Sequence, residues 1–275
     1  MVYLQPDSGI AARLRYSYIT RISFSEKIHR HHFLLRCMPS MSSVQQTMES
    51  YFSISPECSY TQSTDWFGNT IITGSIEGFH DYFEFKSEGV VQTFKYRINE
   101  ALNRLFLYPS QYTQPLPSIR QLDDELHFSE NLNAHQRVAA ISDLVNSRLQ
   151  YITGSTGIET TAAAALEQGA GVCQDFAQLA IALCRLSGVA ARYVSGFMEG
   201  EGFTHAWLEY YYEGSWYGYD PTHNRLIENG YIKIAHGRDY ADCAVDKGVF
   251  RGLAQQKLEV YLKAEPDLLG GSFNQ

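Results

Sequence analysis

The sequence predicts an α+β fold made of a β-rich N-terminal domain, residues 1–110, and a second domain, residues 111–275, in which helices pack on an antiparallel sheet. Three observations lead to this prediction. β-branched and aromatic residues form short runs between residues 12 and 108. A proline-rich stretch separates these runs from the rest of the chain. Beyond residue 134, apolar residues recur at helical spacing before strand-like patterns return.

The N-terminal domain is predicted to be an antiparallel sandwich or a curled sheet. Its runs show partial alternation of apolar and polar residues, which is typical of strands with one buried face. Turn-forming pairs such as Gly68-Asn69 and Glu88-Gly89 lie between them. The strand-like runs are LRYSYITRISFSE, HHFLLRCM, SYTQSTDWF, TIITGSIE, YFEFK and VVQTFKYRI.

The segment 108–120, YPSQYTQPLPSIR, is predicted to be the crossover between the two domains. It holds three of the eight prolines of the chain. Because proline fixes φ and lacks the backbone donor, such a segment suits neither a helix interior nor a central strand.

The second domain begins with helical patterns and continues with strands. Val138, Ile141 and Val145 recur at the spacing of one helix face. A Glu213-Gly214 turn joins two of the strands into a hairpin. The predicted helices cover 134–152, 160–169 and 172–188, and the predicted strands cover 189–197, 205–212, 215–220 and 258–264.

The composition is that of a globular protein and narrows the range of partners. The chain has 22 Lys and Arg against 30 Asp and Glu, a net charge of −8. An acidic surface repels phosphate backbones, so we expect no nucleic-acid partner. We also expect no membrane span and no secretory signal, because the chain lacks a run of about 18 apolar residues and a basic, then apolar, start. The five cysteines are scattered without a CxxC pair, which favours a reducing compartment, the cytoplasm.

A cysteine in the setting of a nucleophile opens the third predicted helix, in the stretch GAGVCQDFAQLAIALCRLSG. At a helix start the thiol of Cys173 meets unpaired backbone N–H groups and the positive end of the helix dipole, and both favour the thiolate. The glycines at 169 and 171 allow a sharp turn and a close approach of substrate. The simpler interpretation, a small buried hydrophobic residue, fits Cys184 further along the same helix.

His205 and Asp220 lie at the open end of the predicted hairpin. If the turn centres between Glu213 and Gly214, position 207 opposes 220, and His205 and Asp220 become diagonal neighbours on one face. A nucleophile needs such a pair, in which the carboxylate orients the imidazole. Taken singly, each residue fits an ordinary strand or turn position.

A family resemblance rests on three C-terminal stretches, GVCQDFAQLAIALCRLSGVAARYVSGF, THAWLEYYYEGSWYGYDPTHN and YIKIAHGRDYADCAVDKGVFRG. These resemble the transglutaminase-like superfamily, and more narrowly its bacterial members that are often described as candidate cysteine proteases. The N-terminal half, with DWFGN at 65–69 and LYPS at 107–110, resembles the N-terminal region of that bacterial group. The resemblance implies a papain-like catalytic core in which Cys173, His205 and Asp220 form a Cys-His-Asp triad.

From this triad we expect cysteine-dependent acyl transfer or hydrolysis at amide bonds of peptide or protein substrates, through a thioester intermediate. Two alternatives stay open: a peptidase or amidase without amine transfer, and a non-catalytic binding module that keeps the fold. We expect no cofactor. His29, His31 and His32 lie together, but the spacing of the surrounding cysteines and carboxylates does not support a metal site, so we expect no metal.

Three further features near the triad have two interpretations each. Gln168 or Tyr151 could add a second oxyanion donor to the backbone N–H of Cys173, or both could be ordinary packing or helix-surface residues. Asp175 either influences the charge of Cys173 or is simply an acid favoured in the first turn of a helix. The glycines in 200–202 form either a mobile rim of the cleft or a plain surface loop.

Overall fold

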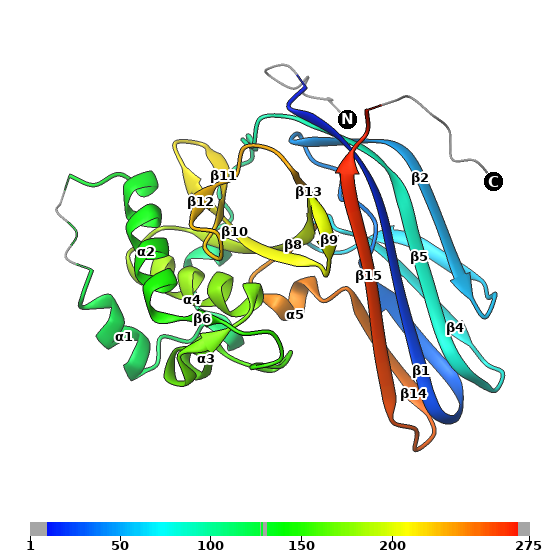
Figure 1. Cartoon of the computed structure of the whole chain (residues 1–275). Coiled ribbons are helices and arrows are strands. Elements are labelled where there is room, and N and C mark those ends of the chain that lie inside the picture. Colours follow the sequence, from blue (N-terminus) through cyan, green and yellow to red (C-terminus); the bar gives the residue numbers. More distant parts are fainter. Residues whose placement is uncertain (1–9, 127, 129–130, 269–275) are drawn as a thin grey trace.

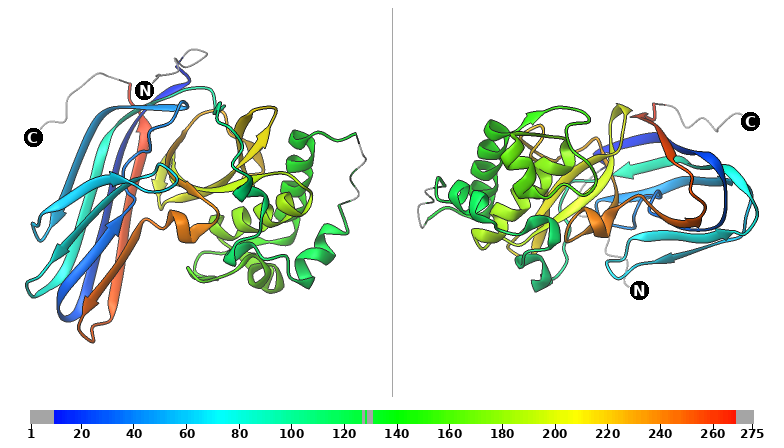
Figure 2. Two further views of the ribbon diagram at one scale, coloured as in Figure 1. Left: turned by 180° about the vertical axis from the view of Figure 1, so that it is seen from behind. Right: turned by 90° about the horizontal axis from the view of Figure 1, so that it is seen from below.

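The structure, a computed structural model, describes residues 10–126, 128 and 131–268. It has two parts, a large curled sheet and a smaller unit in which helices cover a second sheet (Figures 1 and 2). The α+β class predicted from the sequence is confirmed. Of the two forms predicted for the β-rich part, a sandwich or a curled sheet, the structure has the curled sheet.

Among the described residues, eight strands form the large sheet, in the order β2-β5-β1-β15-β9 with β14, β4 and β3 attached through the far half of β1. β1 shifts its pairing between Ser23 and Ile28. Its first half pairs with β5 and β15, and its second half pairs with β4 and β14, so the sheet can curl. The strands are β1 (Ala12–Leu35), β2 (Gln45–Ser55), β3 (Tyr60–Thr64), β4 (Thr70–Ile76), β5 (His80–Thr93), β9 (Gly200–Gly202), β14 (Asp246–Arg251) and β15 (Gln256–Pro266).

Alternation of buried and less buried residues along the first half of β1 builds the core of this sheet. Leu14, Tyr16, Tyr18 and Ile22 are all buried, because side chains two residues apart share one face of a strand. The rings of Tyr16 and Tyr18 also contact Phe197, at 5.4 and 5.0 Å between ring centroids. Phe197 belongs to the second sheet, so the two parts share one core.

The end of the chain returns to the large sheet. β15 pairs with β1 from Leu14 opposite Pro266 to Phe24 opposite Gln256. The sequence predicted a strand at 258–264 but assigned it to the second domain. The structure places it beside β1, where it covers an edge of β1 that would otherwise be open.

The chain crosses from the first sheet to the second over residues 94–117. Ile98 exchanges backbone hydrogen bonds of 3.0 and 2.9 Å with Trp216 of β11 (Ser215–Asp220), so the crossover lies against the second sheet. The crossover therefore begins before the predicted 108–120 stretch. Its short helices are η1 (Arg104–Leu107), η2 (Gln111–Thr113) and the start of α1 (Pro117–Asp123).

The second sheet is antiparallel, with the order β12-β11-β10-β8-β13. The predicted helices and hairpin of this unit are confirmed within a few residues, except that the first helix ends at Arg148 rather than 152. Leu208 lies opposite Tyr219, which is the predicted hairpin register. The strands are β8 (Ala191–Met198), β10 (His205–Tyr212), β11, β12 (Arg225–Leu226) and β13 (Tyr231–Gly237), beside the parallel pair β6 (Gln150–Tyr151) and β7 (Ala170–Gly171).

Helix α4 (Cys173–Leu186) is the central helix of this unit. Every residue from 175 to 185 is buried, which fits a helix that is apolar almost all round. It packs against β10 and against the helices α2 (Ala134–Arg148) and α3 (Ala162–Gln168), and the short α5 (Tyr240–Cys243) lies against β8 and β13. In the described ranges, no helix is long and apolar enough to cross a membrane.

Candidate active site

Cys173 is the first residue of α4. Its side chain is half-buried, and its Sγ atom lies 4.0 Å from the carbonyl oxygen of Thr204. Gly171 is required by close packing, because a Cβ at that position would lie 2.6 Å from the Cβ of Asp175. This close packing at Gly171 sets the backbone directly before α4, and the thiol lies at the tip of a rigid helix.

Asp175 closes the start of the same helix. Its Oδ2 atom accepts hydrogen bonds from the backbone N–H of Val172 at 2.8 Å and from the hydroxyl of Thr156 at 2.6 Å. Burial raises the pKa of Asp175, and these hydrogen bonds oppose that shift. The structure therefore favours the interpretation of Asp175 as a residue that caps the first turn.

His205 opens β10, Asp220 ends β11, and the two side chains meet. The Nε2 atom of His205 lies 2.8 Å from Oδ2 of Asp220, and both residues are buried. The predicted diagonal contact is confirmed. Because Nε2 is engaged by Asp220, Nδ1 is the ring nitrogen left to face Cys173.

The surroundings of His205 favour its charged form. Burial lowers the pKa of His205, but hydrogen bonds with Asp220 and Cys173 outweigh it and raise the pKa to about 9. The folded pKa lies above the ordinary value of 6.5, so this contact stabilises the fold fully below about pH 6.5 and less as pH rises through about 9. An imidazolium at neutral pH is the partner that a thiolate needs.

Asp220 has further partners beyond His205. The hydroxyl of Tyr231 donates to Oδ2 at 2.6 Å, and Nδ1 of His223 lies 2.7 Å from the same atom. Backbone amides of Thr222 and His223 donate to Oδ1 at 2.9 and 3.2 Å. Burial by itself raises the pKa of Asp220, but the side-chain hydrogen bonds hold it well below its usual range. Asp220 is therefore ionised and held in one orientation.

The sequence did not identify His223, Tyr231 or Arg225 as part of this site. Arg225 donates to the hydroxyl of Tyr231 from Nε at 3.2 Å and from Nη2 at 2.9 Å. His223 follows Asp220 by three residues in a turn, and that spacing is a signal that could have found it. Tyr231 comes from β13, which pairs with β8 rather than with β11, and no local pattern marks it.

Three of these residues also have the ligand types of a metal site. One donor atom each from His205, Asp220 and His223 lie within 4.8 Å of one another. Both histidine nitrogens stand at hydrogen-bond distance from one carboxylate oxygen, so the contacts are accounted for as hydrogen bonds. The expectation of no metal stays a prediction. His31 lies elsewhere, with its Nδ1 3.2 Å from Nε2 of His80 in the large sheet.

The two candidates for a second oxyanion donor differ in their surroundings. The amide of Gln168 donates to the carbonyl oxygen of Ser155 at 2.8 Å. Tyr151 is half-exposed on β6, which pairs with the β7 strand just before Cys173. Burial raises the pKa of Tyr151, and the charges of Cys173 and Asp220 add to this shift. Tyr151 is the better placed of the two.

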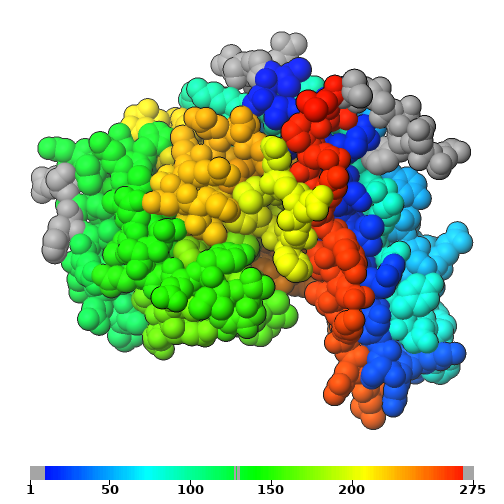
Figure 3. All heavy atoms as spheres, viewed as in Figure 1, coloured from blue at the N-terminus to red at the C-terminus, as the bar shows by residue number. Residues whose placement is uncertain are grey.

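The segment before His205 is anchored to the large sheet. Residues 200–202 form β9, which pairs with β15 from Leu262 opposite Gly202 to Ala264 opposite Gly200. Figure 3 shows this yellow segment against the red β15 strand. Gly200 and Gly202 have φ values of 129° and 144°, which only glycine adopts without strain. The segment is a paired strand, which neither sequence interpretation anticipated.

Tyr231→Phe is expected to lower the free energy of unfolding by about 1–2 kcal/mol at pH 7, because a buried carboxylate loses one charge-assisted hydrogen bond. The folded pKa of Asp220 lies well below the ordinary value of 3.8, so this stabilisation is complete above 3.8 and is lost only as pH falls through the depressed folded pKa. The deficit of the variant should therefore shrink at acid pH. Urea unfolding at pH 7 and at the lowest pH at which both proteins still fold measures the two free energies of unfolding.

Tyr16→Phe is the matched control for that experiment. It removes another buried hydroxyl, which lies 3.2 Å from Ser87 Oγ in the large sheet and far along the chain from Asp220. The loss in free energy of unfolding caused by Tyr16→Phe should not depend on pH over the same range. A Tyr231→Phe deficit that is equally independent of pH would contradict the role given to the hydroxyl.

Comparison with known families matches two segments of the chain. Residues 120–221 match the transglutaminase-like superfamily, and residues 14–92 match the bacterial transglutaminase-like N-terminal region. Cys173, His205 and Asp220 all lie inside the first segment. The residues between the segments, which include the crossover, belong to neither.

Relatives are known among mycobacteria and among solved structures. An uncharacterized protein of Mycobacterium leprae is 34% identical over 167 residues, covering 57% of this chain and 59% of the relative. One from Mycobacterium bovis is 41% identical over 115 residues, 36% of this chain and 37% of the relative. The matches therefore span less than two thirds of the length of these relatives.

A candidate cysteine protease from Cytophaga hutchinsonii has the same fold. Its crystal structure superposes with a TM-score of 0.78 and 24% identity, covering 96% of this chain and 93% of that chain. The likeness extends over both the large sheet and the helical unit. The two matched segments show the family: the chain has the core of the transglutaminase-like superfamily at residues 120–221 and the bacterial N-terminal region of that group at residues 14–92.

Proposed function

We propose that this protein is a cysteine-dependent enzyme that cleaves or transfers the acyl group of amide bonds in peptide or protein substrates. The observation that carries the proposal is the position of His205, which hydrogen-bonds with Asp220 and whose pKa is raised by both Asp220 and Cys173. The family match supports the general class, and the geometry supports the assignment of roles.

The first step forms a thioester. His205 holds the proton of Cys173, and the Sγ thiolate attacks the carbonyl carbon of the amide. The carbonyl oxygen becomes an oxyanion, for which the backbone N–H of Cys173 at the start of α4 is a ready donor. The C–N bond then breaks as His205 gives its proton to the leaving nitrogen, so that an amine or ammonia departs and the acyl group stays on sulfur.

The second step releases the acyl group. Water or a second amine attacks the thioester carbon while His205 accepts its proton, and the C–S bond breaks. Asp220 keeps the imidazole in one orientation and stabilises its positive charge throughout. The triad serves both outcomes equally, so the nucleophile that reaches the thioester decides the reaction.

The burial of two tryptophans supports water as the nucleophile that attacks the thioester. An acceptor amine needs its own binding place beside the sulfur to compete with water. Trp207 and Trp216, on the two strands of the hairpin that carries His205 and Asp220, could have lined such a place, but both are fully buried. A hollow of about 380 Å³ is lined by residues that include Arg225 and Tyr231 but not Cys173.

Hydrolysis or deamidation is therefore expected to exceed amine transfer. The measurement supplies a glutamine-containing peptide with a labelled primary amine and compares amine incorporation with ammonia release and backbone cleavage. Cys173→Ala serves as the blank. Efficient incorporation at low millimolar amine would establish a transglutaminase and reverse the expected preference.

A further inference from the structure

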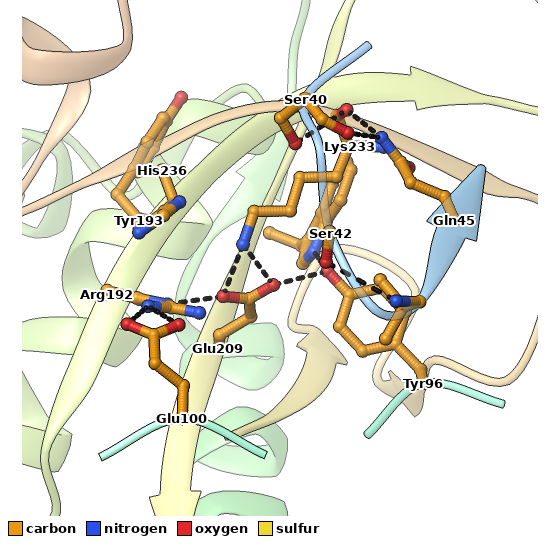
Figure 4. Close-up of polar contacts among 12 residues, drawn as sticks. Ser40, Ser42, Gln45, Tyr96, Glu100, Arg192, Tyr193, Glu209, Lys233 and His236 are labelled. Atoms are coloured by element: carbon orange, nitrogen blue, oxygen red, sulfur yellow. Dashed lines mark hydrogen bonds and ion pairs between the residues drawn. The ribbon is translucent and has the colours of Figure 1, made fainter. Parts of the chain in front are cut away.

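A buried polar network occupies the face of β10 that carries His205. Trp207 and Glu209 share this face with His205, because side chains two residues apart point the same way along a strand. Leu208 and Tyr210 point to the other face, into the core that contains α4. Glu209 is fully buried and is the centre of the network, with Arg192 and Lys233 converging on its carboxylate (Figure 4).

Tyr96, from the crossover between the two sheets, joins this network to Trp207. The indole Nε1 of Trp207 donates to the hydroxyl oxygen of Tyr96 at 2.9 Å, and that hydroxyl donates to Oε1 of Glu209 at 2.7 Å. Trp207 is fully buried and Tyr96 is 7% exposed. One hydroxyl therefore satisfies both the indole N–H and part of the carboxylate.

Trp207 in turn contacts the residues that hold the catalytic pair. Its ring meets the ring of Tyr231 edge-on, with 5.3 Å between centroids, and lies roughly parallel to His205 at 6.3 Å. Tyr231 is the residue whose hydroxyl donates to Asp220. A shift of the indole would therefore disturb both members of the pair.

A glycine leaves room for the indole beside this pair. Gly196 on β8 lies opposite His205, and a Cβ at Gly196 would lie 2.4 Å from Cη2 of Trp207. The ring thus fills a slot with no spare space on that side, and the Tyr96 hydroxyl fixes its polar end.

We propose that Tyr96 is a positioning residue for the His205–Asp220 pair and acts through Trp207. Tyr96 lies in the crossover, outside both matched family segments. In this proposal a residue of the crossover helps to position the active site. This inference rests on the proposed function, because it gives Tyr96 a role in the reactivity of Cys173.

Tyr96→Phe is expected to slow alkylation of Cys173 by iodoacetamide at pH 7 by about tenfold, since small losses of alignment at a catalytic pair have effects of that order or larger. The substitution keeps the ring but leaves the Trp207 N–H buried without an acceptor, and the indole must move to find one. The groups that face His205 are Asp220, Cys173, His223 and Tyr231. A weaker contact with Asp220 lowers the pKa of His205, so the loss of the charged form should begin at lower pH.

Tyr210→Phe is the matched control. It removes a buried hydroxyl from the opposite face of the same strand, where the partner is Nδ1 of His135 at 2.5 Å. Its alkylation rate and pH profile should match those of the wild type. Thermal unfolding of each variant shows whether the fold is kept.

Trp207→Phe provides the second variant. It removes the indole N–H and should slow alkylation by itself, and adding Tyr96→Phe to it should slow the rate no further. A wild-type rate and pH profile in Tyr96→Phe would overturn the inference, as would additive losses in the double variant or an equal loss in Tyr210→Phe. If Tyr96→Phe does not fold, an unaltered rate in Trp207→Phe overturns it. A wild-type Cys173 that reacts no faster than Cys58 would instead remove the proposed function, and this inference with it.

Discussion

Cys173→Ala is expected to lower amide turnover by ~10⁴-fold or more while leaving the fold intact. In the proposed mechanism the sulfur of Cys173 bonds to the substrate, and alanine fills most of the same half-buried position. His205→Ala should cause a loss of the same order, because the proton of the thiol then has no acceptor. Asp220→Asn should keep a small residual rate, since the imidazole remains but loses its fixed orientation.

Selective alkylation measures the reactivity of the Cys173 thiol and needs no known substrate. Iodoacetamide at neutral pH should label Cys173 at least about tenfold faster than any other thiol, because only this cysteine combines a helix start, a histidine partner and partial exposure. Burial raises the pKa of the thiol of Cys184 to about 12 and also raises that of Cys37 and Cys243. Peptide mapping by mass spectrometry follows each cysteine separately.

Cys58 is the internal control for this experiment. It is half-buried like Cys173, and burial raises its pKa with no charged partner to oppose the shift. Uniform labelling, or faster labelling of Cys58, would remove the main support for the triad. Full turnover in Cys173→Ala or in His205→Ala would refute the assignment directly.

The positions of the three proposed triad residues could be predicted from the sequence because each depends on local structure. The position of Cys173 follows from a helix start that glycine residues and an apolar run make visible. The contact of His205 with Asp220 follows from a hairpin whose register is set by its turn, where Glu213 and Gly214 adopt φ values of 44° and 82°. Such signals lie within a few residues of the atoms they position.

The support of the triad could not be predicted because it is built by pairings distant in sequence. Tyr231 reaches Asp220 from β13, and Tyr96 reaches Trp207 from the crossover. The return of β15 to β1, and of β9 to β15, depends on which edges are left open once the large sheet has formed. No periodicity or motif in those segments identifies their partners.

Glu209 is another residue whose surroundings could not be predicted from the sequence. In the run HAWLEYYY, a glutamate between apolar residues would be expected to lie at an exposed position of the strand. In the structure it is fully buried and accepts from Arg192 Nε at 2.5 Å and from Lys233 Nζ at 2.8 and 2.9 Å. Arg192 also pairs with Glu100 (Figure 4). Its guanidinium carbon lies 4.2 Å from the centroid of the Trp216 ring. The cations that compensate Glu209 come from two other strands of the sheet.

Glu209→Gln is therefore expected to lower the free energy of unfolding by about 3–5 kcal/mol at pH 7, the usual cost of breaking a buried ion pair by removing one partner. Both side chains that it leaves behind are buried cations, and among the described residues the half-exposed Glu100 is the acid that still pairs with one of them, Arg192. The midpoint of urea unfolding measures the loss. Glu125→Gln is the matched control, because it makes the same change in an exposed pair with Arg148 and should cost well under ~1 kcal/mol.

The dependence on pH identifies the cause of that loss. Burial is the main reason that the pKa of Lys233 is lowered to about 8, and the charge of Glu209 opposes the shift. Without this charge the pKa of Lys233 falls further. A lysine with a depressed folded pKa costs stability while it is charged, and the cost is relieved as pH rises through that pKa. In the variant Lys233 loses its charge at lower pH than in wild type. The difference in the free energy of unfolding between the variant and wild type should therefore narrow as pH rises from 7 towards about 8.

A double variant separates uncompensated charge from lost packing. Adding Lys233→Met to Glu209→Gln removes one of the two unpaired cations and keeps an unbranched side chain in its place, so the double variant should be more stable than Glu209→Gln alone. Lys233→Met by itself leaves Glu209 with Arg192 and Tyr96 as partners and should cost less than Glu209→Gln. If the two losses simply add, or if Glu209→Gln is no worse than Glu125→Gln, the network does not hold the sheet through its charges.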